Sequence, residues 1–158
     1  MRRSWVVTLL VLFASFAVVG TVLATHTPAV TNSTTAVARG TLSDEVKYNR
    51  DGIKVQTKQP VQVATAEVSF PAHSSAGWHS HPGPVFVVVR EGTLTVWDET
   101  CAHRTYTVGD SFFEAGPDHP LLVKNETGSL ARVYATFISP VGTGPLRIGT
   151  EHLCGIAE

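Results

Sequence analysis

The prediction of the fold rests on residues 77–92, which read Gly77-Trp78-His79-Ser80-His81-Pro82-Gly83-Pro84-Val85-Phe86-Val87-Val88-Val89-Arg90-Glu91-Gly92. Side chains alternate between the two faces of an extended strand, so His79 and His81 should point the same way and could bind one metal ion. Gly92 would close the following hairpin. Two nearby histidines are common by chance, so the pattern gains meaning only with a third ligand and a strand-rich context.

The strand-rich context begins at Leu42. Short runs of Val, Thr, Phe and Ile alternate with Gly, Pro, Asn and Asp, which is typical of an all-β sandwich or barrel. The run from Val85 to Val89 is apolar on both faces, as expected for a strand packed between layers. The strands that we expect are 53–57, 61–70, 85–90, 93–97, 104–107, 111–114, 121–124 and 131–138.

A third histidine follows in residues 109–120, Gly109-Asp110-Ser111-Phe112-Phe113-Glu114-Ala115-Gly116-Pro117-Asp118-His119-Pro120. Gly109-Asp110 and Gly116-Pro117 predict turns on either side of a short strand. In a small antiparallel barrel, the strand that follows can lie beside the one that bears His79 and His81. We therefore expect His119 to reach the same interior point.

At these two segments the sequence resembles the cupin superfamily. The first cupin motif has a Gly, a His-x-His, a Glu four residues later and a closing Gly; the second has Gly-Asp, Pro-x-Gly and a His. The closing Gly92, Gly109-Asp110, Gly116 and His119 match these patterns. The resemblance covers most of the domain, roughly residues 61–138. It implies a small antiparallel β-barrel of the cupin or jelly-roll type, with a metal ion on His79, His81 and His119.

Two positions depart from the family pattern. Val85 stands where cupins usually have a glutamate ligand, and Glu114 stands at the usual proline of the second motif. Glu114 could replace the ligand only if its loop folded inward, and a loop glutamate is more often solvated. Three neutral imidazoles suit a divalent transition metal such as Zn, Fe(II), Cu or Ni better than Mn, which favours carboxylate oxygen. Some cupin thiol dioxygenases also use three histidines.

The rest of the chain predicts export. Residues 1–24 have a charged start and a long apolar run ending in Val22-Leu23-Ala24, which indicates a cleaved signal peptide or an uncleaved N-terminal membrane anchor. Residues 25–41 read as a flexible linker, and residues 42–158 as the cupin-like barrel domain. Outside the cytoplasm, Cys101 and Cys154 are more often a disulfide than a ligand pair.

These features leave two classes of function open. One is a metal-dependent oxygenase or related enzyme acting on a small molecule; the other is a non-catalytic module that binds a small ligand or the ion itself. A third alternative is a barrel whose histidines have only a structural role. The net charge of −1 and the scattered basic residues argue against nucleic acid as a partner. Membrane contact is expected only through the N-terminal segment. Aromatic side chains outside the barrel interior are candidates for a homodimer surface.

Overall fold

The computed structural model describes residues 32–158, and in that part of the chain the ordered secondary structure is β-strand. All eight expected strands are present within two residues of the expected bounds: β3 (Ile53–Gln56), β4 (Val61–Phe70), β7 (Val85–Glu91), β8 (Thr93–Asp98), β9 (His103–Thr107), β10 (Ser111–Glu114), β11 (Leu121–Asn125) and β12 (Ala131–Pro140). The extended strand assumed at His79 is the short β6 (His79–Ser80). Four more were not expected: β1 (Ser33–Leu42), β2 (Lys47–Arg50), β5 (Ser74–Ser75) and β13 (Ile148–Gly149). The expected signal or anchor lies outside the described residues.

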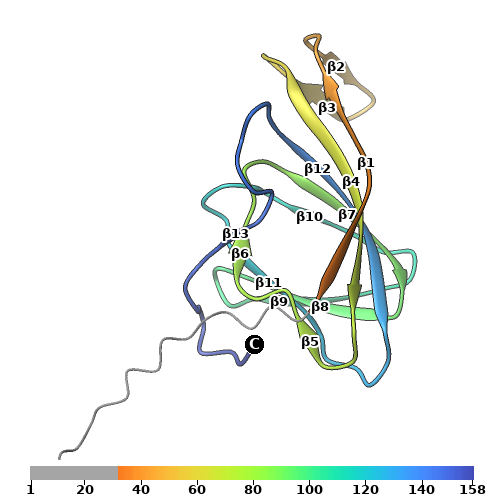
Figure 1. Ribbon diagram of the computed structural model, residues 1–158, viewed down its shortest axis with the longest axis vertical. Coiled ribbons are helices and arrows are strands. Elements are labelled where there is room, and N and C mark those ends of the chain that lie inside the picture. Colours follow the sequence, from red (N-terminus) through yellow and green to blue (C-terminus); the bar gives the residue numbers. More distant parts are fainter. Residues whose placement is uncertain (1–31) are drawn as a thin grey trace, which may run out of the picture.

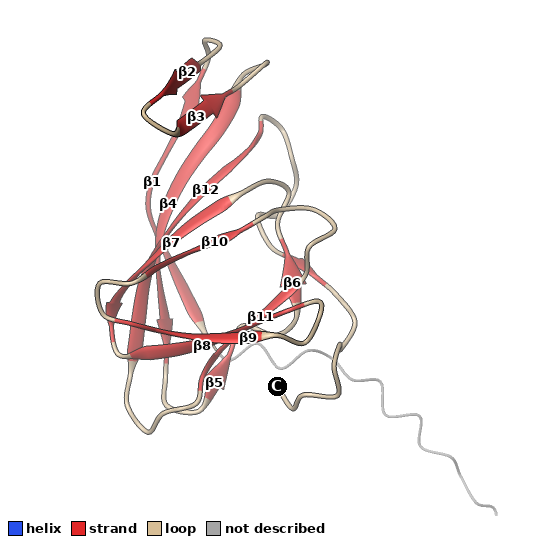
Figure 2. Cartoon of the chain, turned by 180° about the vertical axis from the view of Figure 1, so that it is seen from behind, coloured by secondary structure: helices blue, strands red, loops and turns tan. Residues whose placement is uncertain are grey.

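The strands form two main antiparallel sheets that face each other (Figure 1). The first sheet has the order β1-β4-β12-β7-β10, and the second has the order β13-β6-β11-β8-β9, with β5 also paired to β11. A separate β2–β3 hairpin projects from one end of the molecule (Figure 2). The prediction of an all-β fold of the jelly-roll type is confirmed, although the strands pair as two facing sheets and not as one closed ring. Among residues 32–158, no helix is long and apolar enough to span a membrane.

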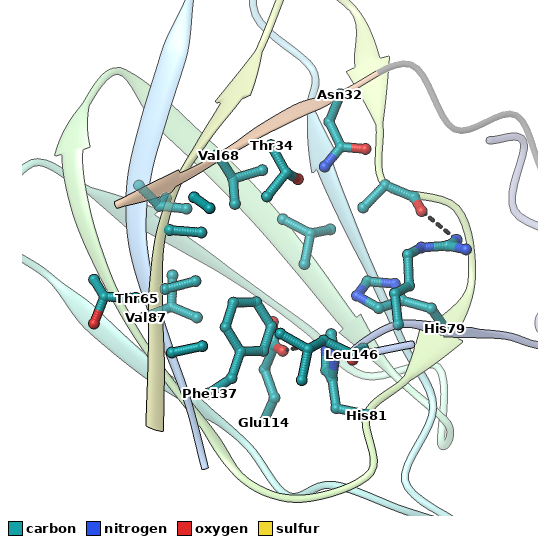
Figure 3. Close-up of a pocket in the computed structure, with 18 of the residues that line it drawn as sticks. Asn32, Thr34, Thr65, Val68, His79, His81, Val87, Glu114, Phe137 and Leu146 are labelled. Atoms are coloured by element: carbon teal, nitrogen blue, oxygen red, sulfur yellow. Dashed lines mark hydrogen bonds and ion pairs between the residues drawn. The ribbon is translucent and has the colours of Figure 1, made fainter. Parts of the chain in front are cut away.

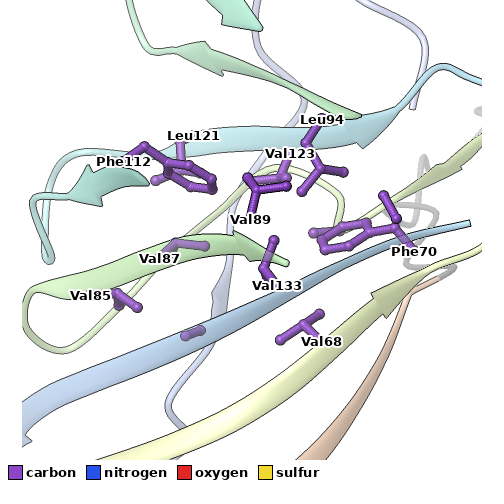
Figure 4. Packing of buried hydrophobic residues seen from close by; sticks show 13 residues of the cluster. Val68, Phe70, Val85, Val87, Val89, Leu94, Phe112, Leu121, Val123 and Val133 are labelled. Carbon is purple, nitrogen blue, oxygen red and sulfur yellow. The ribbon is translucent and has the colours of Figure 1, made fainter. Parts of the chain in front are cut away.

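The core lies between the two sheets (Figure 4). Strand β7 turns Val85, Val87 and Val89 inward, where each is at most 3% exposed, and turns Phe86 and Val88 outward. The expectation that this run is buried on both faces is therefore wrong, because no second layer covers the outer face in the described chain. Burying a valine side chain stabilises the fold by about 1.5–3 kcal/mol. The other buried members of the cluster are Val68, Phe70, Ala76, Leu94, Phe112, Leu121, Val123, Ala131, Val133 and Ala135.

Several aromatic side chains lie on the outer face of the first sheet. The rings of Phe86 and Phe113 are 5.1 Å apart, and the Arg90 guanidinium lies 5.6 Å from the centre of the Tyr134 ring. Phe86 and Phe113 are more than half exposed. A homodimer through this face stays a prediction.

Strand β1 occupies part of the segment expected to be a linker. It pairs antiparallel with β4, from Ser33 opposite Ser69 to Leu42 opposite Val61. Its side chains are all exposed, because it is the outermost strand of the first sheet. Backbone hydrogen bonds, and not apolar burial, hold it in place, so its composition of small and polar residues gave no sign of a strand. Residues 33–41 of the predicted linker therefore belong to a sheet, and residues 25–31 lie outside the described part of the chain.

Residues after β12 run back across the second sheet as a C-terminal segment (Figure 1). Strand β13 pairs with β6, the strand that carries His79. The backbone of Trp78 accepts a hydrogen bond from Thr150 N at 3.1 Å and donates one to Glu158 Oε1 at 3.0 Å. Trp78 is fully buried, so its side chain packs in the interior.

A disulfide joins this segment to the domain. Cys101, in the turn between β8 and β9, bonds to Cys154, as predicted, with the Cα atoms 5.6 Å apart. The bridge closes a loop with a sequence separation of 53 residues. It therefore restrains the unfolded chain as well as holding the C-terminal segment in place.

Replacing Cys101 and Cys154 by alanine should lower the free energy of unfolding by about 4 kcal/mol, the chain-entropy value for a loop of this length. Denaturant unfolding of the oxidised protein and of the double variant measures the difference. The oxidised protein should also have no thiol that reacts under denaturing conditions. Two reactive thiols, or equal stability of the two proteins, would contradict the pairing.

Candidate metal centre

His79 and His81 lie side by side in the interior. His79 belongs to the two-residue strand β6, which pairs with Leu121 of β11 on one side and with Gly149 of β13 on the other. Both imidazoles are buried, and their ring centres are 4.8 Å apart. The alternation expected from the sequence thus brings these two side chains to one point.

Both imidazoles are oriented by backbone carbonyls. Nδ1 of His79 donates to Gly77 O at 2.7 Å, and Nδ1 of His81 donates to Leu146 O at 2.5 Å. A carbonyl oxygen can only accept, so each neutral ring carries its proton on Nδ1 and has an unprotonated Nε2. Metal-binding histidines are commonly held in this way.

The third group of the cluster is Glu114. Strand β10 alternates, with Phe112 and Glu114 facing inward and Phe113 facing outward. Glu114 stands opposite Val85 in the β10–β7 ladder, so it presents a carboxylate beside the position where the cupin pattern has its glutamate. Its side chain is 6% exposed, and its Oε2 lies 2.7 Å from Nε2 of His81 (Figure 3). The expectation of a solvated Glu114 is corrected.

His119 lies apart from this cluster. Its side chain is 56% exposed, and its Nδ1 is 3.0 Å from Oε1 of Glu99 on the outside of the second sheet. The turn between Glu114 and His119 contains Gly116 with φ +102° and Asp118 with φ +63°, which directs the chain outward after β10. A Cβ on Gly116 would lie 2.9 Å from the Gly83 carbonyl carbon, so the turn is packed against the loop after His81. In the structure, therefore, the Glu114 carboxylate and not His119 lies beside His79 and His81.

The contact between His81 and Glu114 shows that this donor set fits a cation. With Nδ1 bonded to Leu146 O, the neutral His81 ring offers Glu114 a lone pair, and an ionised carboxylate offers another. Two acceptors at 2.7 Å repel each other unless a proton or a metal ion lies between them. The ligand atoms of His79, His81 and Glu114 all lie within 4.8 Å of one another. Two imidazoles and one carboxylate form a common donor set for Zn and Fe(II).

His79 is kept neutral by its surroundings. Burial lowers its pKa from the ordinary 6.5 to about 4; the charge of Glu114 opposes this shift, and His81 and Arg147 add to it. A neutral imidazole is the form that binds a metal. His79 is therefore ready to act as a ligand at neutral pH without first losing a proton.

A cavity of about 450 Å³ adjoins the three residues (Figure 3). Its walls come from both sheets and from the C-terminal segment. The apolar part is lined by Ala36, Ala38, Ala64, Ala66, Val68, Phe70, Ala76, Val87, Phe112, Val123, Val133, Ala135, Phe137, Pro145 and Leu146. Outside the three-residue cluster, the polar lining residues are Asn32, Thr34, Arg39, Thr65 and Arg147. A mostly apolar cavity of this size with a few polar groups at one end is typical of a small-molecule site.

Sequence reasoning placed His79 and His81 but missed three contributors to this site. The alternation of Phe112 and Glu114 in 111–114 was a usable signal for an inward Glu114. Leu146 and Arg147, which line the cavity, come from the C-terminal segment and follow no motif. His73, which lies outside both motifs, is on an exposed turn before β5.

Comparison of the sequence with protein-family models gives no match, and comparison with curated protein sequences gives none. Similar solved structures do exist. They include a sugar phosphate isomerase of the cupin superfamily from Silicibacter pomeroyi (22% identity, TM-score 0.43), with 47% of this chain and 48% of that chain covered. A cupin superfamily protein from Desulfitobacterium hafniense has 11% identity and a TM-score of 0.47, with 68% and 77% covered. A predicted oxalate decarboxylase from Thermotoga maritima has 20% identity and a TM-score of 0.41, with 53% and 84% covered.

The two facing sheets carry the His-x-His on β6 and the second motif on β10 and the turn after it. This is a cupin-type fold. The chain spans about half the length of the isomerase, and the similarities concern architecture alone. The chemistry of this protein has to be argued from its own residues.

Acidification should destabilise the metal-free protein through His79. The unfolded chain regains the ordinary pKa of 6.5, so between pH 6.5 and about 4 it binds more protons than the folded chain. The stability that neutral His79 contributes to the folded state is fully present above about pH 6.5. About 3 kcal/mol of the free energy of unfolding is lost as the pH falls from there through the folded pKa near 4. Urea unfolding with a chelator, from pH 7 to pH 4, measures the loss.

The matched comparison is His79→Gln, which removes the titrating group. Its stability should fall less steeply over the same pH range, and the difference between the two curves isolates His79. Parallel curves for the two proteins would contradict the assignment.

Proposed function

We propose that this protein binds a divalent transition metal through His79, His81 and Glu114 and presents it to a small molecule in the adjoining cavity. The observation that carries the proposal is the buried cluster of His79, His81 and Glu114, whose ligand atoms all lie within 4.8 Å of one another. Nε2 of His81 and Oε2 of Glu114 are 2.7 Å apart, a contact that a proton or a metal ion between them would stabilise. Zn, Fe(II), Cu and Ni are all candidates, and the two-histidine, one-carboxylate set favours Zn or Fe(II).

The chain's own residues would divide the work of the site. His79 and His81 would hold the ion as neutral ligands, and Glu114 would offset part of its charge. The apolar walls would exclude water and hold the organic part of a ligand beside the ion. The ion itself would supply Lewis-acid or oxygen chemistry at its open positions.

A non-catalytic binding module is the second candidate. Among the described residues that line the cavity, Glu114 is the single carboxylate, and it already faces His81. A lining with no further carboxylate has few groups to move protons during a reaction. Oxygen uptake or product formation with a panel of thiols and catechols separates an enzyme from a carrier, and a metal-loaded protein that is silent across the panel favours the carrier.

Metal binding can be tested with a set of single variants. The unmodified protein should bind one equivalent of Zn, and His79→Ala and His81→Ala should abolish that binding in calorimetric titration. Glu114→Gln should weaken it by more than about tenfold, because the amide carries no charge. His119→Ala is the matched control and should bind Zn within about twofold of the parent.

Two outcomes would sink this assignment of ligands. One is an unmodified protein that takes up no metal even after loading with Zn, Fe(II), Ni or Cu. The other is loss of metal in His119→Ala with full retention in Glu114→Gln, which would restore the three-histidine site.

We also propose that the folded part lies outside the cytoplasm. A disulfide is typical of proteins in oxidising compartments, and residues 1–24 have the sequence of an export segment. N-terminal sequencing of the mature protein should give Thr25 if the segment is a cleaved signal. Recovery of intact Met1 from the membrane fraction would indicate the anchor, and intact Met1 from the cytosol would contradict both.

A further inference from the structure

Arg147 is a charged cavity residue that the proposed metal centre does not use. It lies between Leu146, whose carbonyl orients His81, and strand β13. Its side chain lines the same cavity as His79, and its Nη2 donates to Ala76 O at 2.5 Å. One end of the cavity therefore contains a guanidinium group beside the histidines.

The guanidinium has hydrogen-bonding capacity to spare. Its Nε is shut off from solvent and has no hydrogen-bond partner within residues 32–158. None of the ion pairs in that part of the chain includes Arg147. Burial lowers the pKa of Arg147 and the charge of Glu158 opposes this shift, but a guanidinium stays charged at neutral pH. The guanidinium is half-buried and its hydrogen bond goes to Ala76 O, so it keeps N–H donors that can bind an anion in the cavity.

The other cavity residues limit what kind of anion fits. Most of the wall is made of alanine, valine and phenylalanine side chains, which suit an apolar body; the polar lining residues outside the metal centre are Asn32, Thr34, Arg39, Thr65 and Arg147. A carboxylate matches the planar fork of an arginine with two oxygens and carries one charge. Phosphate carries more charge and is more heavily hydrated, so a mostly apolar cavity favours the monocarboxylate.

We propose that the cavity takes a small organic monocarboxylate with an apolar body, and that Arg147 binds its carboxylate. This inference rests on the proposed function, since it names the class of ligand for the same site. A metal ion bound by Glu114 would add to the positive potential at the Arg147 end of the cavity. The contact with Arg147 does not itself require the ion. The two claims can therefore be tested separately.

The first test compares three probes on the oxidised full-length protein by calorimetry, with a chelator present. Hexanoate should bind at least about tenfold more tightly than hexan-1-ol, which has the same apolar chain without the charge. Inorganic phosphate should bind more weakly than hexanoate. Equal affinity for hexanoate and hexan-1-ol, or tighter binding of phosphate, overturns the proposal.

The second test changes the arginine. Arg147→Gln should weaken hexanoate binding by roughly 10- to 100-fold, the range for a lost charge-assisted pair, and leave hexan-1-ol unchanged. Arg147→Lys keeps the charge but loses the fork, so it should fall between the parent and the glutamine variant. Arg50→Gln, on the exposed β2–β3 hairpin, is the matched control and should bind as the parent does.

Two readouts separate this proposal from a loss of structure and from the metal proposal. Thermal unfolding shows whether Arg147→Gln is folded. If it is not, the hexanoate affinity of Arg147→Lys is compared with that of the parent protein. Equal hexanoate affinity of these two proteins overturns the proposal. Zn titration of the same variants reports on the metal centre independently. Hexanoate binding that depends on Arg147 supports the inference even if no metal binds, and hexanoate binding indifferent to Arg147 overturns it even if Zn binds fully.

Discussion

The site depends on the way in which His81 is held between two oxygen atoms. Leu146 O accepts the proton on Nδ1, and Nε2 faces the Glu114 carboxylate at 2.7 Å. Neither contact can relax into water, because both side chains are buried. A buried imidazole and carboxylate at this distance need a proton or a metal ion between them.

Glu114 lies directly opposite Val85, the position where the cupin sequence pattern has a glutamate. Val85 and Glu114 are opposite each other in the β7–β10 ladder, and both face inward. Directly opposite residues have Cβ atoms about 4.5–5.5 Å apart. A carboxylate moved from one strand to the other therefore still reaches the same interior region. The sequence motif is altered, but the donor set of two imidazoles and a carboxylate is retained.

Much of the fold could be predicted because strands of Val, Ile and Phe separated by turn residues have a strong local pattern. His79 and His81 could be placed by strand alternation, and the disulfide by the even pair of cysteines. Strand β1 could not be recognised, because backbone pairing holds it and its side chains carry no hydrophobic signal. The exchange of His119 for Glu114 depends on the direction of one turn, and Arg147 reaches the cavity through long-range pairing of β13 with β6. Neither effect is encoded in a short stretch of sequence.

The C-terminal segment also fixes the order in which the site can be completed. Leu146 O and strand β13 come from the last 13 residues of the chain, together with Cys154 and Glu158. A partly synthesised chain that ends before them can pair β7 with β10 and β12, but it lacks the acceptor that orients His81. The orientation of the His81 ring therefore arises only once a segment 65 residues further along the chain has docked.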